Sequence, residues 1–216
     1  MAIEIVLVDD HSIVRQGLNA IISREKDIRV IGEAENGRDA VKLVKDKEPD
    51  IAILDISMPI LNGLEASRQI RKISPKTKII ILSMHDNHAF IDEVLNLGAR
   101  AYVLKESAAD EVVIAINEVY RGRIFLSPKI STFVVKGYIN RDEKTEKQKP
   151  TVNLTPREKE ILQLIAEGHL NKEIAEQLNL SLKTVLAHRN NMMQKLNIHK
   201  QADLVRYAIK EGIAHL

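Results

Sequence analysis

The chain contains no cysteine and no long hydrophobic run. Without thiols it can form neither disulfides nor thiolate metal sites, which fits a reducing compartment. No stretch approaches the roughly 18 consecutive apolar residues that a membrane-spanning helix needs. The first residues, MAIEIVLVDDH, place acids directly behind a short apolar run, unlike a secretory signal peptide. We therefore expect a cytoplasmic protein that does not act at a membrane.

Charge is nearly balanced over the whole chain, with a formal net charge of +2, but it is unevenly distributed. Residues 1–125 hold 17 Lys and Arg against 20 Asp and Glu, a net of −3, whereas residues 126–216 hold 15 against 10, a net of +5. A basic carboxyl-terminal part suggests a polyanionic partner for that part. A length of 216 residues with 44% hydrophobic residues is enough for two small domains, each with its own core.

Five short apolar segments alternate with five amphipathic segments over residues 1–122. Short, β-branched segments that are almost continuously apolar are typical of strands buried on both faces, and the segments between them have helical spacing. This alternation predicts right-handed crossovers, and hence an α/β domain with a doubly wound, five-stranded parallel sheet. The expected strands are Ile3–Val8, Val30–Glu33, Ile51–Leu54, Ile79–Leu82 and Ala101–Leu104, and the expected helices are Ser12–Ser23, Gly37–Lys47, Gly63–Ile73, Ala89–Leu97 and Ala108–Arg121.

The composition changes after residue 122. Residues 123–150 include the polar string NRDEKTEKQK and are predicted to be a linker, although Ile130–Tyr138 is apolar enough to form a helix that packs on a neighbour. In the last part, residues 151–216, Thr155 precedes Pro156 and Glu158, a capping box with proline at the first helical position. This part is predicted to be a small all-α four-helix domain. Its expected helices are Pro156–Glu167, Asn171–Leu178, Leu182–Leu196 and Gln201–Glu211.

Polar residues follow the expected strands at one edge of the sheet, where open parallel sheets bind their ligands. Asp9 and Asp10 follow the first strand, Asp55 the third, Ser83 the fourth and Lys105 the fifth. Three carboxylates repel one another unless a cation compensates them, and hard oxygen ligands favour Mg²⁺. A metal, a lysine and a hydroxyl beside a carboxylate can receive a phosphoryl group. Each residue alone could instead cap a helix or form a surface ion pair, but the set in this order favours a phosphoryl acceptor.

The strings IVLVDDH, ILDISMPILNG, ILSMHD and GARAYVLKES resemble the receiver domain of two-component response regulators. The resemblance spans residues 1–122 and implies a flavodoxin-like fold. It implies that Asp55 accepts a phosphoryl group from a phosphohistidine of a cognate sensor histidine kinase. It also implies that Asp10 and Asp55 bind Mg²⁺ directly, helped by the backbone carbonyl of Ser57, while Asp9 acts mostly through water.

The same resemblance assigns the reading of the phosphate to three further side chains. Ser83 and Lys105 would bind the phosphoryl oxygens, and Tyr102 would respond by moving inward. Receivers commonly carry a small residue after the serine, and this chain has Met84, which should affect the rate and stability of phosphorylation. His85 either tunes hydrolysis of the aspartyl phosphate, together with Ser57, or is simply an exposed loop histidine.

Two alternative functions compete with a phosphorylated regulator. A phosphohydrolase of the haloacid-dehalogenase type also uses an aspartate after a strand, but it needs a second acid two residues later, where this chain has Ser57. We therefore expect no enzyme activity beyond Mg²⁺-dependent self-phosphorylation from phosphohistidine and slow autodephosphorylation. The other alternative is a constitutive DNA-binding or protein-interaction module whose receiver is no longer phosphorylated, which Met84 allows.

The expected helices Asn171–Leu178 and Leu182–Leu196 are separated by a short turn, the spacing of a helix-turn-helix. The second of them carries amide and guanidinium groups of the kind that read base edges, and nearby lysines could contact phosphates. The alternative is a plain four-helix module with one polar face. The candidate DNA-contacting residues are Lys172, Lys183, Thr184, Leu186, Ala187, His188, Arg189, Asn190 and Lys195.

The strings LTPREKEILQLIAEG, NKEIAEQLNLSLKTV and QKLNIH resemble the LuxR-type helix-turn-helix, over about residues 151–214. A receiver, a linker and this module together resemble the NarL/FixJ class of response regulators. The resemblance implies that the third helix enters the major groove of a two-fold double-stranded operator, and that phosphorylation favours a homodimer. It implies a dimer contact through the fourth helix, with Leu204, Ala208 and Ile209. Leu186 and Asn190 stand where basic residues are frequent, so we expect fewer phosphate contacts and more apolar or amide contact with bases.

Overall fold

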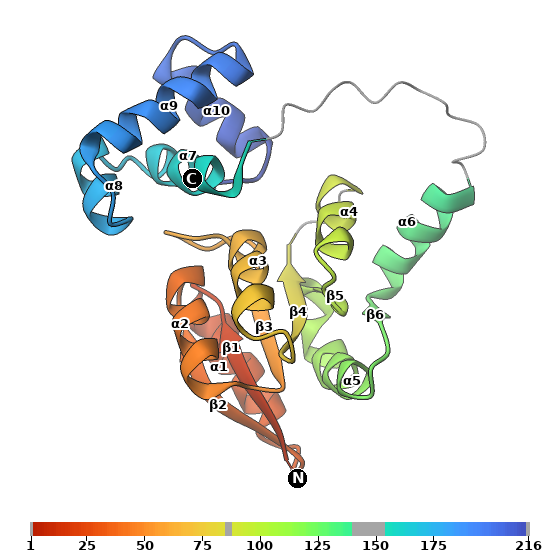
Figure 1. Cartoon of the computed structure of the whole chain (residues 1–216). Coiled ribbons are helices and arrows are strands. Elements are labelled where there is room, and N and C mark those ends of the chain that lie inside the picture. Colours follow the sequence, from red (N-terminus) through yellow and green to blue (C-terminus); the bar gives the residue numbers. More distant parts are fainter. Residues whose placement is uncertain (1, 85–87, 140–153, 215–216) are drawn as a thin grey trace. The chain divides into compact units, whose positions relative to one another are not determined.

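The computed structural model describes residues 2–84, 88–139 and 154–214. These residues belong to two compact units: an α/β unit with strands β1 to β6, and an all-α unit with helices α7 to α10 (Figure 1). This architecture confirms the predicted fold class. Within the described part of the chain, no helix combines the length and the apolar character needed to cross a membrane.

The α/β unit is built on one parallel sheet with the strand order β2-β1-β3-β4-β5-β6. The central strand β3 is buried along its whole length, as its sequence IAILD requires when helices cover both faces. Because all strands run in the same direction, their carboxyl ends meet at one edge of the sheet. The strands are β1 (Ile3–Val8), β2 (Ile28–Ala34), β3 (Ile51–Asp55), β4 (Lys78–Ser83), β5 (Ala101–Leu104) and β6 (Phe125–Leu126).

Among the residues that the structure describes, the sheet has six strands, so the prediction of five was wrong. The additional strand, β6, is only two residues long and pairs with Ala101 and Tyr102 of β5. Two residues cannot show a period-two pattern, so the sequence carries no signal that separates β6 from a loop. This strand and the following helix α6 (Pro128–Ile139) lie within the segment predicted as linker, and the rest of that segment, 140–150, lies outside the described residues.

Helices cover both faces of the sheet (Figure 1). On one face, α1 and α5 bury their apolar sides against β1, β3, β4 and β5. On the other face, α2, α3, α4 and α6 contribute to a second apolar cluster. The bounds are α1 (Ser12–Ile22), α2 (Gly37–Lys47), α3 (Gly63–Ile73), α4 (His88–Asn96) and α5 (Ala108–Tyr120), with a short 3-10 turn at Lys105–Ser107 between β5 and α5.

Gly63, the first residue of α3, packs directly against the end of β3. A Cβ at this position would lie 2.0 Å from the backbone carbonyl oxygen of Asp55, far inside van der Waals contact. The Gly63 amide donates to the Ile56 carbonyl at 2.9 Å, which fixes the loop between strand and helix. A side chain at position 63 would therefore displace the backbone that carries Asp55.

The all-α unit consists of α7 (Pro156–Ala166), α8 (Asn171–Gln177), α9 (Leu182–Leu196) and α10 (Gln201–Lys210). The predicted capping box is confirmed: the Glu158 amide donates to the Thr155 hydroxyl at 3.2 Å, and the Thr155 amide donates to the Glu158 carboxylate at 2.8 Å. Apolar residues from all four helices share one core, so burial against one another holds these short helices in place.

Candidate functional site

The carboxyl edge of the sheet brings together residues far apart in the sequence. The Lys105 ammonium lies 2.7 Å from Asp55 Oδ2 and 2.8 Å from Asp9 Oδ2. Carboxylate oxygens of Asp9, Asp10 and Asp55 all lie within 4.8 Å of one another. Asp9 and Asp55 are almost completely buried, whereas Asp10 is exposed. These four side chains therefore lie together at one edge of the sheet, as the sequence predicted.

Ser83 occupies the strand next to the Asp55 strand. Asp55 pairs in register with Leu82, so Ser83 follows directly beside it, and Ser83 itself pairs with Leu104, the residue before Lys105. Ser83 is fully buried at this edge. Asp55, Ser83 and Lys105 thus stand at the ends of the three neighbouring strands β3, β4 and β5, at the same edge of the sheet.

Burial and the neighbouring charges shift the pKa values of the central pair. Desolvation raises the pKa of Asp55 from 3.8 to about 6, although Lys105 pulls it in the opposite direction. Burial alone would lower the pKa of Lys105, but the carboxylates of Asp55 and Asp9 outweigh it, so that this pKa is raised. Lys105 therefore stays charged at neutral pH, and Asp55 is ionised above about pH 6 in metal-free protein.

The raised pKa of Asp55 predicts how stability depends on pH when divalent ions are removed. Between pH 3.8 and about 6 the folded state holds a proton that the unfolded state has lost, so stability falls as the pH rises through this window. Asp55→Asn does not titrate. We expect the unfolding free energy of wild type, relative to that variant, to fall by about 1–3 kcal/mol between pH 4 and 7. Urea unfolding in EDTA would measure this difference; a difference that stays constant with pH would contradict it.

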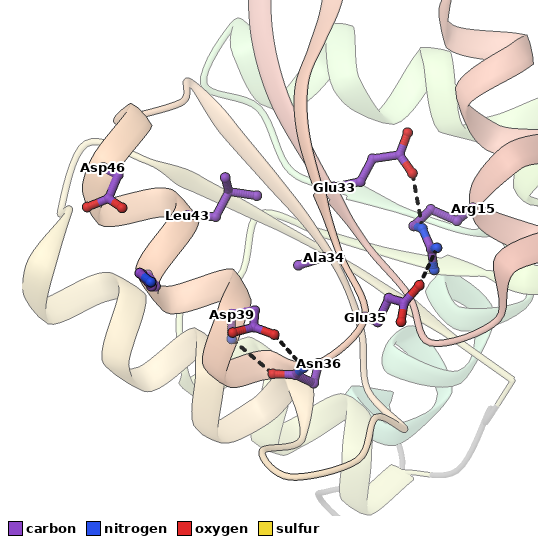
Figure 2. Close-up of a pocket in the computed structure, with 9 residues that line it drawn as sticks. Arg15, Glu33, Ala34, Glu35, Asn36, Asp39, Leu43 and Asp46 are labelled. Atoms are coloured by element: carbon purple, nitrogen blue, oxygen red, sulfur yellow. Dashed lines mark hydrogen bonds and ion pairs between the residues drawn. The ribbon is translucent and has the colours of Figure 1, made fainter.

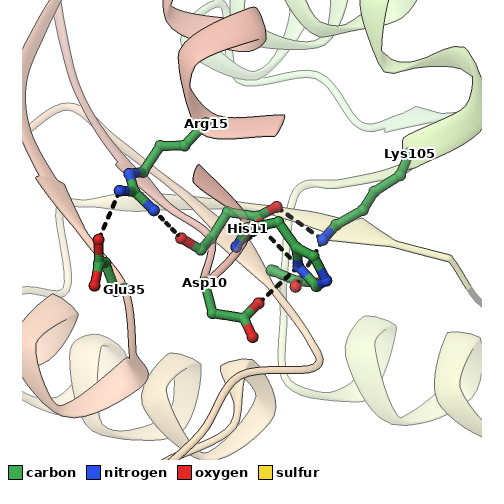
Figure 3. Close-up of polar contacts among 7 residues, drawn as sticks. Asp10, His11, Arg15, Glu35 and Lys105 are labelled. Carbon is green, nitrogen blue, oxygen red and sulfur yellow. Dashed lines mark hydrogen bonds and ion pairs between the residues drawn. The ribbon is translucent and has the colours of Figure 1, made fainter. Parts of the chain in front are cut away.

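Two residues that the sequence did not single out hold the loop after β1 (Figure 3). The mostly buried Arg15 donates to the Asp9 carbonyl oxygen at 2.6 Å and pairs with Glu33 at 3.0 Å and Glu35 at 2.7 Å. His11 donates its amide to Asp9 Oδ1 at 2.8 Å, and its Nδ1 lies 2.9 Å from Asp10 Oδ1. Arg15 lies on α1, five residues after Asp10. The sequence showed no sign of its partners, because Glu33 and Glu35 come close to it only when α1 packs beside β2.

A pocket of about 500 Å³ lies next to this loop, between the end of β2 and α2 (Figure 2). Arg15 forms part of its wall, but Asp9, Asp10, Asp55 and Lys105 are not among the lining residues. Four carboxylates and two cationic side chains line this pocket. One of the carboxylates, that of Asp39, is hydrogen-bonded to Asn36 at the start of α2. The phosphoryl-acceptor candidates therefore lie outside this pocket, at the open edge of the sheet.

The chemistry of the donor set fits a divalent metal ion. At this edge of the sheet, the three carboxylates of Asp9, Asp10 and Asp55 lie close together, with the ammonium group of Lys105 among them. An excess of hard oxygen donors, one of them exposed to solvent, is what Mg²⁺ uses when it keeps several waters. Ser57, the fourth predicted ligand, is half-buried, and its backbone amide hydrogen-bonds the Asp55 carboxylate.

The remaining predicted residues of the α/β unit differ in their surroundings. The Tyr102 ring is fully buried and belongs to the apolar cluster shared by α4 and α6. Because the ring is already buried, an inward movement of Tyr102 on phosphorylation would have to start from a different conformation, in which the ring is exposed. Met84 is 75% exposed and points away from the packed interior. His85, the proposed tuning residue, lies outside the described residues.

In the all-α unit, α9 carries an exposed polar surface at its amino-terminal half. Val185 and Met192 face the core, while Lys183, Leu186 and Asn190 are exposed. The Ser181 hydroxyl caps the helix by accepting from the Thr184 amide at 3.1 Å. Of the other candidates, Lys172 and Ala187 are exposed, and Thr184 and His188 are half-buried.

Two predicted DNA contacts have partners inside the protein. Lys195 lies 2.8 Å from both carboxylate oxygens of Glu158, the buried acid of the capping box, so it is engaged within the unit and not held free for a phosphate. Burial would raise the pKa of Glu158, but hydrogen bonds from Lys195 and Thr155 hold it below its ordinary value. Arg189 is half-buried and donates to Gln201 at 3.0 Å. Spacing along the helix could not reveal either partner.

The dimer contact predicted for α10 needs a correction. Leu204 and Ala208 are fully buried in the core of the all-α unit and cannot face a second molecule. Ile209 is half-buried, and Ala202 and Arg206 are exposed on the outer side of the helix. The helical pattern was read correctly, but its apolar stripe faces α7 and the core.

Comparisons with known proteins agree with this geometry. Residues 5–117 match the family of response regulator receiver domains, and residues 152–208 match the bacterial regulatory proteins of the luxR family. The chain is 40% identical to the oxygen regulatory protein NreC of Staphylococcus carnosus, covering 97% of this chain and 98% of that protein. It is 37% identical to the transcriptional regulatory protein DegU of Brevibacillus brevis, covering 97% and 94%.

Solved structures show the same likeness. The response regulator RcsB of Salmonella typhimurium is 27% identical with a TM-score of 0.66, over 97% of this chain and 98% of that one. A structure of an RcsB–DNA complex is 28% identical with a TM-score of 0.60, over 96% and 98%.

Proposed function

Because the chain belongs to the response regulators that join a receiver domain to a LuxR-type DNA-binding domain, we propose that it is switched by phosphorylation of Asp55. The phosphoryl group would come from a phosphohistidine of a sensor histidine kinase. Phosphorylation would change dimerisation and sequence-specific DNA binding, and thereby transcription. The observation that carries this proposal is the Lys105 ammonium placed within 2.8 Å of both Asp55 and Asp9.

The transfer step follows from the chemistry of the edge. An oxygen of the Asp55 carboxylate attacks phosphorus, a P–O bond forms, and the P–N bond of the phosphohistidine breaks with its electron pair leaving on the imidazole. Lys105 faces the charge that arrives on the phosphoryl oxygens, and Ser83 pairs in register with Leu104, the residue before Lys105. A Mg²⁺ ion bound through Asp9, Asp10 and Asp55 would supply further positive charge at the same place.

The step ends at the acyl phosphate and does not lead to repeated turnover. A phosphohydrolase with an aspartate nucleophile needs a general acid and base two residues later, and Ser57 cannot supply a carboxyl group there. Steady multiple turnover on small phosphomonoesters would contradict this part of the proposal.

The DNA-binding unit would use α9 in the major groove. Lys183, Leu186 and Asn190 are exposed on this helix, and they combine a cation, an apolar group and an amide. Asn190 is suited to adenine and Leu186 to a thymine methyl group. A two-fold operator would then require two copies of α9, related by a contact that uses the outer side of α10, around Ala202 and Arg206.

Phosphorylation acts in this proposal by shifting populations. The added charge draws Ser83 and the Lys105 ammonium, which contacts the Asp55 carboxylate in the unphosphorylated protein, toward the phosphoryl oxygens, and this moves the ends of β4 and β5 and the residues packed against Tyr102. Phosphorylation increases the population of a conformational state only if that state interacts more favourably with the phosphoryl group than the other state does. The dimeric, DNA-binding state is the one we propose to be favoured.

Analytical ultracentrifugation and DNA titrations with and without beryllofluoride and Mg²⁺ test the proposal. Beryllofluoride occupies the place of a phosphoryl group on an aspartate. We expect a larger sedimenting mass and an affinity for operator DNA raised by about tenfold or more, in the range typical of coupled sites. The Asp55→Ala variant provides the control, since it should show neither change. Identical mass and DNA affinity in both states of wild type would contradict the proposal.

A further inference from the structure

The end of β5, next to Lys105, is held by a serine from outside the segments that carry the phosphoryl-acceptor residues. Ser127 directly follows β6 and is 1% exposed. Its amide donates to the Tyr102 carbonyl at 2.9 Å, which continues the pairing of β6 with β5. That ladder ends at Tyr102 and Leu126. The outer side of Leu104, the last residue of β5, therefore lies beyond the paired part of β6.

The Ser127 hydroxyl takes over at this point. It accepts a hydrogen bond from the Leu104 amide at 3.0 Å, and it donates to the Glu111 carboxylate in the first turn of α5. A hydroxyl can donate one hydrogen bond and accept two, so both contacts can form at once. One buried side chain therefore joins the end of β5 to the start of α5.

Ser127 also starts helix α6. Its carbonyl accepts from the Ser131 amide at 2.9 Å, with Pro128 as the first helical residue. A serine before a helix usually turns its hydroxyl to the helix's own amides, but here the hydroxyl is directed to β5. Two residues into the helix, the buried Ile130 belongs to the same apolar cluster as Tyr102. The start of α6 is thus attached to β5 by polar and apolar contacts.

We propose that Ser127 is a positioning residue for Lys105. It fixes the Leu104 amide, one residue before Lys105, and so fixes the point from which the lysine side chain reaches Asp55 and Asp9. A displacement of Lys105 toward a phosphoryl group then moves Ser127 and the start of α6. This inference rests on the proposed function, in which Lys105 binds the phosphoryl group.

The physical basis is the short path between the two ends of this connection. Lys105 spans from β5 to the carboxylates with its ammonium 2.7 Å from Asp55, and its own backbone begins the 3-10 turn after Leu104. Catalytic geometry is sensitive to misplacement, and an error on the order of 1 Å can lower a rate by about a hundredfold. Loss of one hydroxyl leaves the buried Leu104 amide without that acceptor and loosens the backbone from which Lys105 extends.

Three variants separate positioning from mere packing. Ser127→Ala removes the hydroxyl and Ser127→Thr keeps it. Ser131→Ala removes a hydroxyl from the first turn of α6 that donates within the same helix, to the Pro128 carbonyl at 2.8 Å. The first readout is the rate of phosphorylation by a small-molecule phosphodonor. We expect it to fall about tenfold in Ser127→Ala and to stay within about twofold of wild type in the other two.

The second readout is the change in amide NMR signals of α6, such as those of Ser131 and Thr132, on adding beryllofluoride and Mg²⁺. We expect this change in wild type and Ser127→Thr, and its loss in Ser127→Ala while the Lys105 signal still responds. An unchanged rate with an unchanged α6 response in Ser127→Ala would overturn the inference, as would equal losses in the alanine and threonine variants.

These experiments distinguish a failure of the inference about Ser127 from a failure of the proposed function. If wild type shows no beryllofluoride response at Lys105 or Ser83, the proposed function fails, and the inference fails with it. If Lys105 responds in all variants and α6 behaves alike in all, only the inference fails. Should Ser127→Ala not fold, Glu111→Ala removes the second contact of the hydroxyl and leaves Ser127 in place. A slower rate and a weakened α6 response in Glu111→Ala would support the inference, and wild-type behaviour would overturn it.

Discussion

Replacing Asp55 with asparagine should abolish phosphorylation of the protein, lowering the rate by about a thousandfold or more. An amide has no charged oxygen to attack phosphorus, and it removes one of the three carboxylates that would hold Mg²⁺. The neighbouring Lys105 would keep its contact with Asp9 at 2.8 Å, so the fold should persist. Incubation with a small-molecule phosphodonor and Mg²⁺, followed by electrophoresis that retards phosphoproteins, measures the yield.

Asp46→Asn is the matched control for this experiment. Asp46 is an exposed acid on α2 that lines the pocket beside β2, away from Lys105, so its replacement should leave phosphorylation unchanged. Asp10, the exposed carboxylate at the same edge, is a competing acceptor. Phosphorylation of Asp55→Asn at a rate close to wild type would show that Asp55 is not the acceptor.

Two lysines on the same helix should behave in opposite ways. Lys183→Ala should weaken DNA binding by about tenfold or more without changing stability, because Lys183 is exposed near the start of α9. A two-fold complex would lose one phosphate contact for each protomer, so the slope of log affinity against log salt should become shallower by about 1.8. Fluorescence anisotropy with labelled operator DNA over a range of salt concentrations measures both quantities.

Lys195→Ala should instead destabilise the all-α unit by about 1 kcal/mol and leave DNA affinity within about threefold of wild type. It removes the partner of the buried Glu158, although the partial exposure of Lys195 limits the cost. Thermal unfolding measured on both variants separates the two roles. Equal losses of DNA affinity in both variants, with unchanged stability, would mean that Lys195 contacts phosphate and releases Glu158 when DNA binds.

Much of the fold follows from patterns within single segments. The buried strands of the sheet and the capping box at Thr155 were predictable because each signal lies within a few residues. The convergence of Asp9, Asp55 and Lys105 was predictable too, because parallel strands must end at one edge. The strands and the capping box needed only local patterns, and the convergence of the site residues needed one topological rule in addition.

What the sequence could not show depends on contacts between distant segments. From the sequence, Lys195 was predicted to contact a phosphate, but in the folded protein it pairs with Glu158 of α7. Leu204 was predicted to form a dimer contact, but it is buried in the core of the all-α unit. Tyr102 lies in an apolar cluster to which α6, within the predicted linker, contributes Ile130. Exposure and pairing are properties of packed helices, and helical spacing alone does not distinguish the side that faces the core of the same molecule from the side that faces a partner.

The contact between Gly63 and the end of β3 limits how this protein can vary. A single added carbon would lie 2.0 Å from the Asp55 carbonyl oxygen, so every other amino acid at position 63 meets the same obstacle, whatever its polarity. Position 84 is exposed at the surface, so side chains of different sizes fit there, whereas at position 63 no side chain fits. The side chains around Asp55 can therefore vary in evolution, whereas the backbone that carries Asp55 keeps its position only with glycine at position 63.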